Sequence, residues 1–184
     1  MRQVFTNETP VAITPDAPTT VTSPMAVTGV SGQIQRLSVS LTLFHTYTSD
    51  LRISLLAPDE KEVLLALGAG GSGDNFIDTT FDSAAPTAIT RARPPFTGTF
   101  RPEGDLSVFN GLDPNGTWTL RITDVSTLDG GALSRWQLSM TLSEAHQSAF
   151  SIDLQFLGGL TPLQQAVFDT AAARWSEIIV GSLP

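Results

Sequence analysis

The sequence contains no cysteine among its 184 residues. This absence excludes a disulfide framework, a zinc site built from thiolates and a cysteine nucleophile. Basic side chains are also scarce: 10 lysines and arginines stand against 18 aspartates and glutamates, for a formal net charge of −8. A nucleic-acid surface needs clustered basic residues, so we expect no nucleic-acid partner.

Long apolar runs are missing as well. No stretch approaches the roughly 20 apolar residues that a membrane-spanning helix needs, so we expect no membrane insertion. The N-terminus lacks the basic region and apolar run of a signal peptide. The lack of cysteine is compatible with a secreted bacterial protein, whose export signal would then lie outside this sequence.

Catalytic residue patterns are few. The two histidines are His45 and His146, and neither a Gly-x-Ser-x-Gly nor a His-Glu-x-x-His motif occurs. Ser72 lies in a glycine-rich loop, residues 68–73, that has no general base nearby in sequence and lacks the Gly-Lys-Ser/Thr of a phosphate loop. We interpret His45 as a packed or hydrogen-bonded structural histidine and expect no intrinsic catalysis.

Alternating apolar and polar residues dominate the first three-quarters of the chain. Leu37, Val39, Leu41 and Leu43 alternate with polar side chains, as in a half-buried strand. The same pattern recurs in several short segments separated by glycine and proline turns. Prolines in residues 1–30 exclude helix there and indicate an extended arm with short edge strands. Residues 1–142 are therefore predicted to form an all-β, jelly-roll-like β-sandwich.

The last part of the chain has a different character. Residues 143–149 are typical of a linker, and residues 150–184 are predicted to be a C-terminal strand-helix appendage that begins a second, truncated region. Alternation from Phe150 to Phe156 predicts the strand. Thr161, Pro162 and Gln164 suit the N-cap, first and capping-box positions of a helix.

That helix has an apolar face formed by residues that include Leu163, Val167 and Trp175. Such a face needs cover. Either it folds back on the sandwich, or it pairs with another chain to form a homodimer, with residues 151–157 exchanged as well.

The aspartates carry most of the remaining chemical information. Many of them fall at strand ends or in loops, and a jelly roll can bring distant loops to one end. Hard cations such as calcium take six to eight oxygen ligands. Aspartate also starts turns by bonding the backbone two residues on, and the residues alone leave both interpretations open. A glycosidase carboxylate pair is disfavoured, because sugar sites add exposed aromatics and the chain has one tyrosine and three tryptophans.

Several short motifs, in order, resemble the P domain (Homo B domain) of kexin- and furin-like proprotein convertases and bacterial subtilases. The resemblance spans about Thr6 to Leu142. It is carried by Thr6-Asn7, Ile13-Thr14-Pro15-Asp16, His45-Thr46-Tyr47-Thr48-Ser49-Asp50-Leu51, Leu55-Leu56-Ala57-Pro58-Asp59, Asn75-Phe76, Phe81-Asp82, Leu106-Ser107-Val108-Phe109-Asn110-Gly111, Gly116-Thr117-Trp118-Thr119-Leu120, Asp124, Asp129-Gly130-Gly131 and Leu133-Ser134-Arg135-Trp136.

The resemblance implies a non-catalytic jelly roll that accompanies a protease domain, supports its folding and stability, and binds calcium. On that basis the best calcium ligands are Asp50, Asp82 and Asp124, with Asp129 and Asp78 as weaker ones. Many relatives carry a second aspartate after the Phe-Asp pair, where this chain has Ser83.

Residues 149–184 resemble instead the opening βα unit of secreted leishmanolysin-like or other zinc metalloproteases. We therefore expect a non-catalytic accessory domain of a secreted bacterial protease, with a serine- or zinc-dependent endopeptidase as parent. The alternative is a module that binds carbohydrate or a cell-surface partner.

Overall fold

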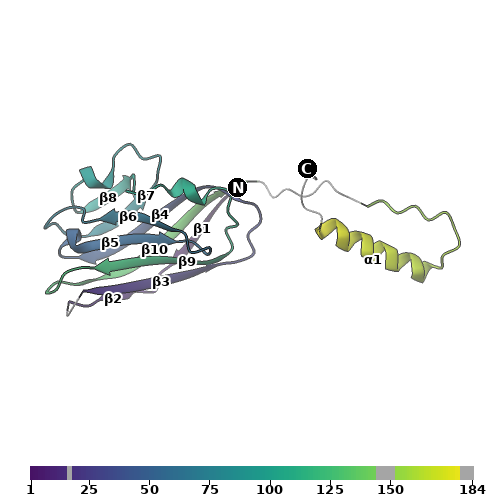
Figure 1. Ribbon diagram of the computed structural model, residues 1–184, viewed down its shortest axis with the longest axis horizontal. Helices are drawn as coiled ribbons and strands as arrows, with labels where there is room; N and C mark the ends of the chain where they lie inside the picture. Colours follow the sequence, from purple (N-terminus) through teal and green to yellow (C-terminus); the bar gives the residue numbers. More distant parts are fainter. Residues whose placement is uncertain (16–17, 144–151, 179–184) are drawn as a thin grey trace. The chain divides into compact units, whose positions relative to one another are not determined.

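The computed structural model describes residues 1–15, 18–143 and 152–178, which belong to two compact units, Met1–Glu144 and Ala145–Pro184. The first unit is a β-sandwich, drawn with its strands labelled in Figure 1. This confirms the predicted all-β sandwich with a C-terminal helix.

Two sheets form the sandwich. The larger has the order β1 (Arg2–Asn7), β10 (Gly131–Leu142), β4 (Ile34–His45), β7 (Phe76–Phe81) and β8 (Phe96–Phe100), and β2 (Val11–Ile13) also pairs with β10. The smaller has the order β3 (Thr19–Val27), β9 (Gly116–Asp124), β5 (Leu51–Leu56) and β6 (Glu62–Leu67). All pairings are antiparallel except that of β7 with β8. Three short 3-10 helices are η1 (Thr48–Asp50), η2 (Ile89–Arg91) and η3 (Leu106–Phe109).

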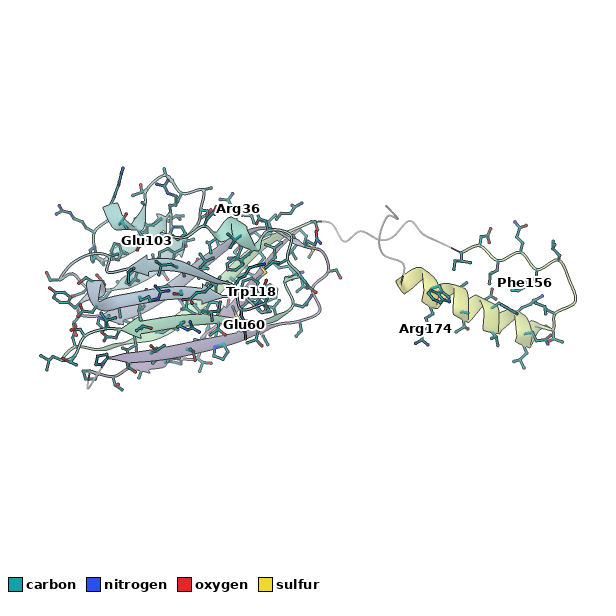
Figure 2. The ribbon with its side chains drawn as sticks, in the orientation of Figure 1. Arg36, Glu60, Glu103, Trp118, Phe156 and Arg174 are labelled. Atoms are coloured by element: carbon teal, nitrogen blue, oxygen red, sulfur yellow. The ribbon has the colours of Figure 1, made fainter. Side chains whose placement is uncertain are left out.

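The core lies between the sheets because each strand turns alternate residues inward. β10 buries Trp136 and β9 buries Trp118, the latter visible inside the sandwich in Figure 2. Each buried indole keeps a hydrogen bond: Trp136 Nε1 donates to Ser23 Oγ (2.9 Å) and Trp118 Nε1 to the Pro114 carbonyl (2.9 Å). Pairing both indoles removes the penalty that an unsatisfied buried N–H would impose.

Edge positions explain where the N-terminal prolines are tolerated. β3 pairs only with β9 in the smaller sheet, and Pro24 lies opposite Thr119. An edge strand leaves one side of its backbone free, so the missing N–H of proline removes no ladder bond there. The other edge, β6, is covered because the Gly104 N–H donates to the Leu64 carbonyl (2.8 Å).

The glycine-rich loop packs on η1 instead of forming a ligand cradle. The Thr48 N–H donates to the Gly73 carbonyl (2.9 Å) and the Ser49 N–H to the Gly71 carbonyl (3.3 Å). Gly70 has φ +95°, and a Cβ there would lie 2.5 Å from Thr48 Oγ1. Glycine is thus required at this position by both conformation and space.

The second unit contains α1 (Pro162–Ile178), which confirms the predicted helix. Its start has the predicted reciprocal cap: the Thr161 N–H donates to Gln164 Oε1 (2.9 Å), and the Gln164 N–H donates to Thr161 Oγ1 (3.4 Å). The predicted strand is wrong in its described part, since residues 152–157 have no strand structure. Phe156 instead packs on Phe168 of α1, with ring centroids 6.2 Å apart (Figure 2).

The reason for that correction is that apolar alternation alone cannot make a strand. Strand structure needs a neighbouring strand to take its backbone hydrogen bonds. Residues 150 and 151, the start of the predicted strand, lie outside the described part of the chain, as do residues 144–149 of the predicted linker.

We expect a chain ending at residue 143 to unfold at the same temperature as the full chain, within about 2 °C for a domain of this size. The large cluster of buried apolar side chains lies entirely within residues 13–142. Thermal circular dichroism would measure both chains, and light scattering would test the predicted homodimer. A fall of more than about 5 °C would show that residues 144–184 cover part of the sandwich.

Candidate metal centre

Three strand ends place titratable side chains together in the sandwich. His45 is the last residue of β4, Asp124 is the last residue of β9, and Asp129 stands two residues before β10. The pairing of β4 with β10 sets Gly131 opposite His45, so the turn that carries Asp129 ends beside His45.

The three side chains converge closely. One ligand atom from each of His45, Asp124 and Asp129 lies within 4.8 Å of the others. His45 is 1% exposed and Asp124 is 0% exposed, and Asp129 is half-buried. His45 Nε2 lies 3.1 Å from Asp124 Oδ2. Among the residues that the structure describes, this is the one group of three or more histidine, aspartate or glutamate side chains so placed.

Hydrogen bonds hold both the backbone and the ring of His45. The His45 N–H donates to Asn75 Oδ1 (2.9 Å), and the His45 carbonyl accepts from the Asn75 N–H (3.0 Å). Nδ1 of the ring lies 3.2 Å from the Tyr47 nitrogen and 3.1 Å from the Tyr47 oxygen. Tyr47 therefore offers this nitrogen both a donor and an acceptor, and either neutral tautomer of His45 finds a hydrogen bond there.

Asp124 is a turn aspartate, which is one of the two interpretations that the sequence left open for the aspartates. Its Oδ1 accepts from the Ser126 N–H (3.0 Å), which is the bond that aspartate makes two residues on in a turn. Its Oδ2 faces His45, so the same carboxylate starts the turn and joins the buried cluster.

Asp129 differs from the other two because one of its oxygens is unsatisfied. Its Oδ1 is buried and has no hydrogen-bond partner among the described residues. Two glycines let its turn approach the sheet: a Cβ on Gly131 would lie 1.8 Å from the Phe44 carbonyl oxygen, and one on Gly130 would lie 2.6 Å from that of Ile13. A buried carboxylate oxygen without a donor is costly unless a cation or water meets it.

Asp50, the first of the other predicted ligands, belongs to the same end of the sandwich. Its carbonyl accepts from the Val125 N–H (2.9 Å), which ties η1 to the residue after Asp124. Its carboxylate is not one of the three groups in the cluster.

Asp82 and Asp78 are paired with arginines on the larger sheet. Asp82 starts a turn through the Ala84 N–H (3.0 Å) and binds Arg36 Nη2 (2.5 Å). Asp78, with φ +49°, accepts from Thr42 Oγ1 (3.0 Å) and forms an ion pair with Arg135. The structure thus brings two of the five predicted ligands together in the cluster, leaves Asp50 beside it, and does not join Asp78 and Asp82 to it.

Calcium is the cation that the resemblance implies, and the donor set can be compared with its needs. Calcium takes six to eight oxygen ligands. The cluster offers two carboxylates and an imidazole nitrogen, a ligand that suits zinc, copper, iron or nickel better than calcium. The orphaned oxygen of Asp129 fits a cation, but the donor set is not that of a calcium cage. Calcium binding stays a prediction.

The geometry does not resemble a catalytic one. Nε2 of His45 faces Asp124, and Nδ1 faces the backbone of Tyr47, so neither ring nitrogen is paired with a hydroxyl nucleophile. The described residues include no helix of the length and apolar character that a membrane span requires. The fold and this cluster define a β-sandwich module with a buried histidine–carboxylate group at one end.

Comparison with known proteins identifies the module. Residues 34–140, more than half of the chain, match the family model described as the proprotein convertase P-domain. The chain belongs to the proprotein convertase P-domain family, whose members are non-catalytic accessory domains. The match ends at residue 140 and gives no support to the leishmanolysin-like resemblance of residues 149–184.

Similar proteins include named proteases. The chain is 35% identical over 136 residues to the transglutaminase-activating metalloprotease of Streptomyces mobaraensis, an alignment covering 74% of this chain and 15% of that protein. It is 30% identical over 140 residues to leupeptin-inactivating enzyme 1 of Streptomyces exfoliatus, covering 74% and 26%. It is 28% identical over 102 residues to a calcium-dependent protease of Trichormus variabilis, covering 54% and 13%. A serine protease of Aeromonas sobria aligns with TM-score 0.42 and 20% identity, over 76% of this chain and 26% of that one.

The sequence reasoning missed His45 as a member of the cluster. The signal was present: His45 ends an alternating strand, and Asp129-Gly130-Gly131 precedes another. The register that sets these two strand ends side by side is a tertiary pairing, which alternation does not specify.

Asp124→Ala should lower the free energy of unfolding by about 2–4 kcal/mol. The substitution leaves the buried His45 imidazole and the Ser126 N–H without their hydrogen-bond acceptor. Asp82→Ala is a matched control, since it removes the same kind of turn bond and an ion pair whose Arg36 side chain is 58% exposed. That control should lose about 1 kcal/mol or less. Urea denaturation would measure the unfolding free energy of both variants. Equal losses would show that the contact between His45 and Asp124 stabilises the fold no more than the exposed ion pair of Asp82 does.

Asp78 should titrate below its usual range. The Arg135 guanidinium, and then the Thr42 hydroxyl, lower the pKa of the Asp78 carboxyl by favouring its charged form. Because the folded-state pKa is depressed, the associated stability is present above the unfolded-state pKa and is lost as pH falls through the folded-state value. Carboxyl NMR titration should show Arg135→Gln raising the pKa of Asp78, and an unchanged value would contradict this cause.

Proposed function

We propose that this domain supports the folding, stability or docking of a catalytic domain in a secreted bacterial protease. The observation that carries the proposal is the P-domain family match over residues 34–140. The environment of His45 agrees with it, because both ring nitrogens are engaged by Asp124 and the Tyr47 backbone.

The relatives support a protease as the parent protein. The aligned regions cover 15% and 26% of the first two relatives, so most of each of those proteins lies outside the shared domain. One is named a metalloprotease. The resemblance to the P domain of convertases and subtilases adds a serine-dependent enzyme, so the parent is proposed to be a zinc- or serine-dependent endopeptidase. An extracellular location follows from the same proposal.

The physical basis of such a role is mass action. A partner that binds only the folded sandwich stabilises it, and the reciprocal interaction stabilises the partner. The sandwich suits this role because its core is formed by long paired strands, with 12 residues in each of β4 and β10. A rigid surface loses little conformational freedom on docking.

Two further predictions remain open beside this role. Calcium is supported by the resemblance and by one relative that is named a calcium-dependent protease. The homodimer through α1 rests on exposed apolar side chains, with Leu163 81% and Val167 66% exposed.

The carbohydrate-binding alternative receives no specific support from the sandwich. Trp118 and Trp136 are both 0% exposed, so neither can stack on a sugar ring. Tyr47 is 40% exposed and is the chain's single tyrosine.

Deleting residues 1–142 from the parent protease should lower the yield and the melting temperature of its catalytic domain, while the isolated chain should hydrolyse no peptide substrate. Activity recovered after refolding, with and without the domain added in trans, would measure the first effect. Casein and fluorogenic peptides would test the second. A catalytic domain that folds and melts identically without the domain would overturn the proposal.

A further inference from the structure

We infer that His45, Asp124 and Asp129 form a binding site for a divalent transition-metal ion of the zinc class, with the imidazole of His45 as a direct ligand. The inference does not depend on the proposed accessory role. It differs from the calcium prediction in both the metal and the ligand set.

The first argument is the composition and spacing of the donors. One nitrogen and two carboxylate oxygens lie within 4.8 Å of one another, so small shifts would bring all three onto one ion. Zinc binds imidazole nitrogen and carboxylate oxygen at about 2.0–2.2 Å. Calcium prefers an all-oxygen shell, so the nitrogen ligand decides between the two classes of metal.

The second argument is the unsatisfied oxygen. Asp129 Oδ1 is buried without a hydrogen-bond partner among the described residues, whereas both Asp124 oxygens accept hydrogen bonds. A buried carboxylate oxygen in this state lacks a positively polarised neighbour. A cation bound between Asp129 and the other two side chains would supply it.

The third argument is the contact behind the imidazole. A histidine that binds metal through one ring nitrogen usually donates its other N–H to a backbone carbonyl or a carboxylate. Tyr47 provides that carbonyl, 3.1 Å from His45 Nδ1. When no ion is bound, Nδ1 can accept from the Tyr47 N–H (3.2 Å) while Nε2–H donates to Asp124. Binding would therefore move the ring proton from Nε2 to Nδ1 without net proton release, and Tyr47 would keep a hydrogen bond to Nδ1 in both states.

The side chains differ in their access to solvent. His45 and Asp124 are essentially fully buried, and Asp129 is half-buried. Its neighbour Leu128 is 93% exposed and has φ +83°. An ion would therefore enter from the turn at Leu128 and Asp129, with water in any remaining coordination position.

The experiment uses the full chain, stripped with EDTA and dialysed, with zinc chloride in isothermal titration calorimetry and cobalt chloride in visible absorption. We expect one zinc ion per chain, a higher melting temperature with zinc than with equimolar calcium, and cobalt d–d bands typical of nitrogen and oxygen ligation.

Asp129→Asn is the decisive variant, because it removes the charge without changing the side chain's shape and leaves the contact between His45 and Asp124 in place. It should weaken zinc binding at least about tenfold, since even losing an outer-shell partner has that effect. Asp82→Asn, at a position paired with Arg36 outside the cluster, and His146→Gln are controls that should bind as the wild type does. His45→Gln should remove the cobalt bands, with circular dichroism confirming that it folds.

The inference is overturned if the wild-type chain binds neither zinc nor cobalt, or if Asp129→Asn binds zinc as tightly as the wild type. It is also overturned if His146→Gln abolishes binding. Stabilisation by calcium but not by zinc would overturn it in favour of the calcium prediction. None of these results bears on the accessory role, which is tested by the stability of the catalytic domain.

Discussion

The antiparallel pairing of β4 with β10 is the constraint on which the rest of the structure depends. These strands lie in the interior of the larger sheet, and their register runs from Ile34 opposite Leu142 to His45 opposite Gly131. One end of that register determines which turn lies beside the imidazole. A shift of one residue would move Trp136 from the core face to the outer face of the sheet, so burial of the indole fixes the position of the cluster.

A buried hydrogen-bonded pair that includes a carboxylate is rarely a net source of stability. Removing His45 and Asp124 from water carries a desolvation penalty that their attraction offsets only with good geometry and further hydrogen bonds. The structure provides those bonds through Asn75, Tyr47 and Ser126. These bonds tie the ends of β4 and β9 to the segments that carry Asn75, Tyr47 and Ser126.

The sequence predicts the sandwich well because its strands show period two and its turns contain glycine and proline. The helix is predicted equally well, since Thr161, Pro162 and Gln164 carry the local signals of a helix start. The site is harder to predict. Asp78, Asp82 and Asp124 all look like turn or strand-end aspartates, and only tertiary pairing gives the first two an arginine and the third a histidine. The apolar alternation after residue 150 gave a wrong strand prediction. A strand forms only where a neighbouring strand takes its backbone hydrogen bonds, and alternation does not identify that neighbour.

The two protected edges of the smaller sheet have a consequence for the behaviour of the chain at high concentration. An open edge strand is a template to which another molecule can add its own strand. Pro24 lacks an N–H and so interrupts the backbone donors along β3. The segment at Gly104 hydrogen-bonds to the outer edge of β6, and Figure 2 labels the adjacent Glu103. The smaller sheet thus offers neighbouring molecules no uninterrupted ladder, and fibre-like growth through it is disfavoured.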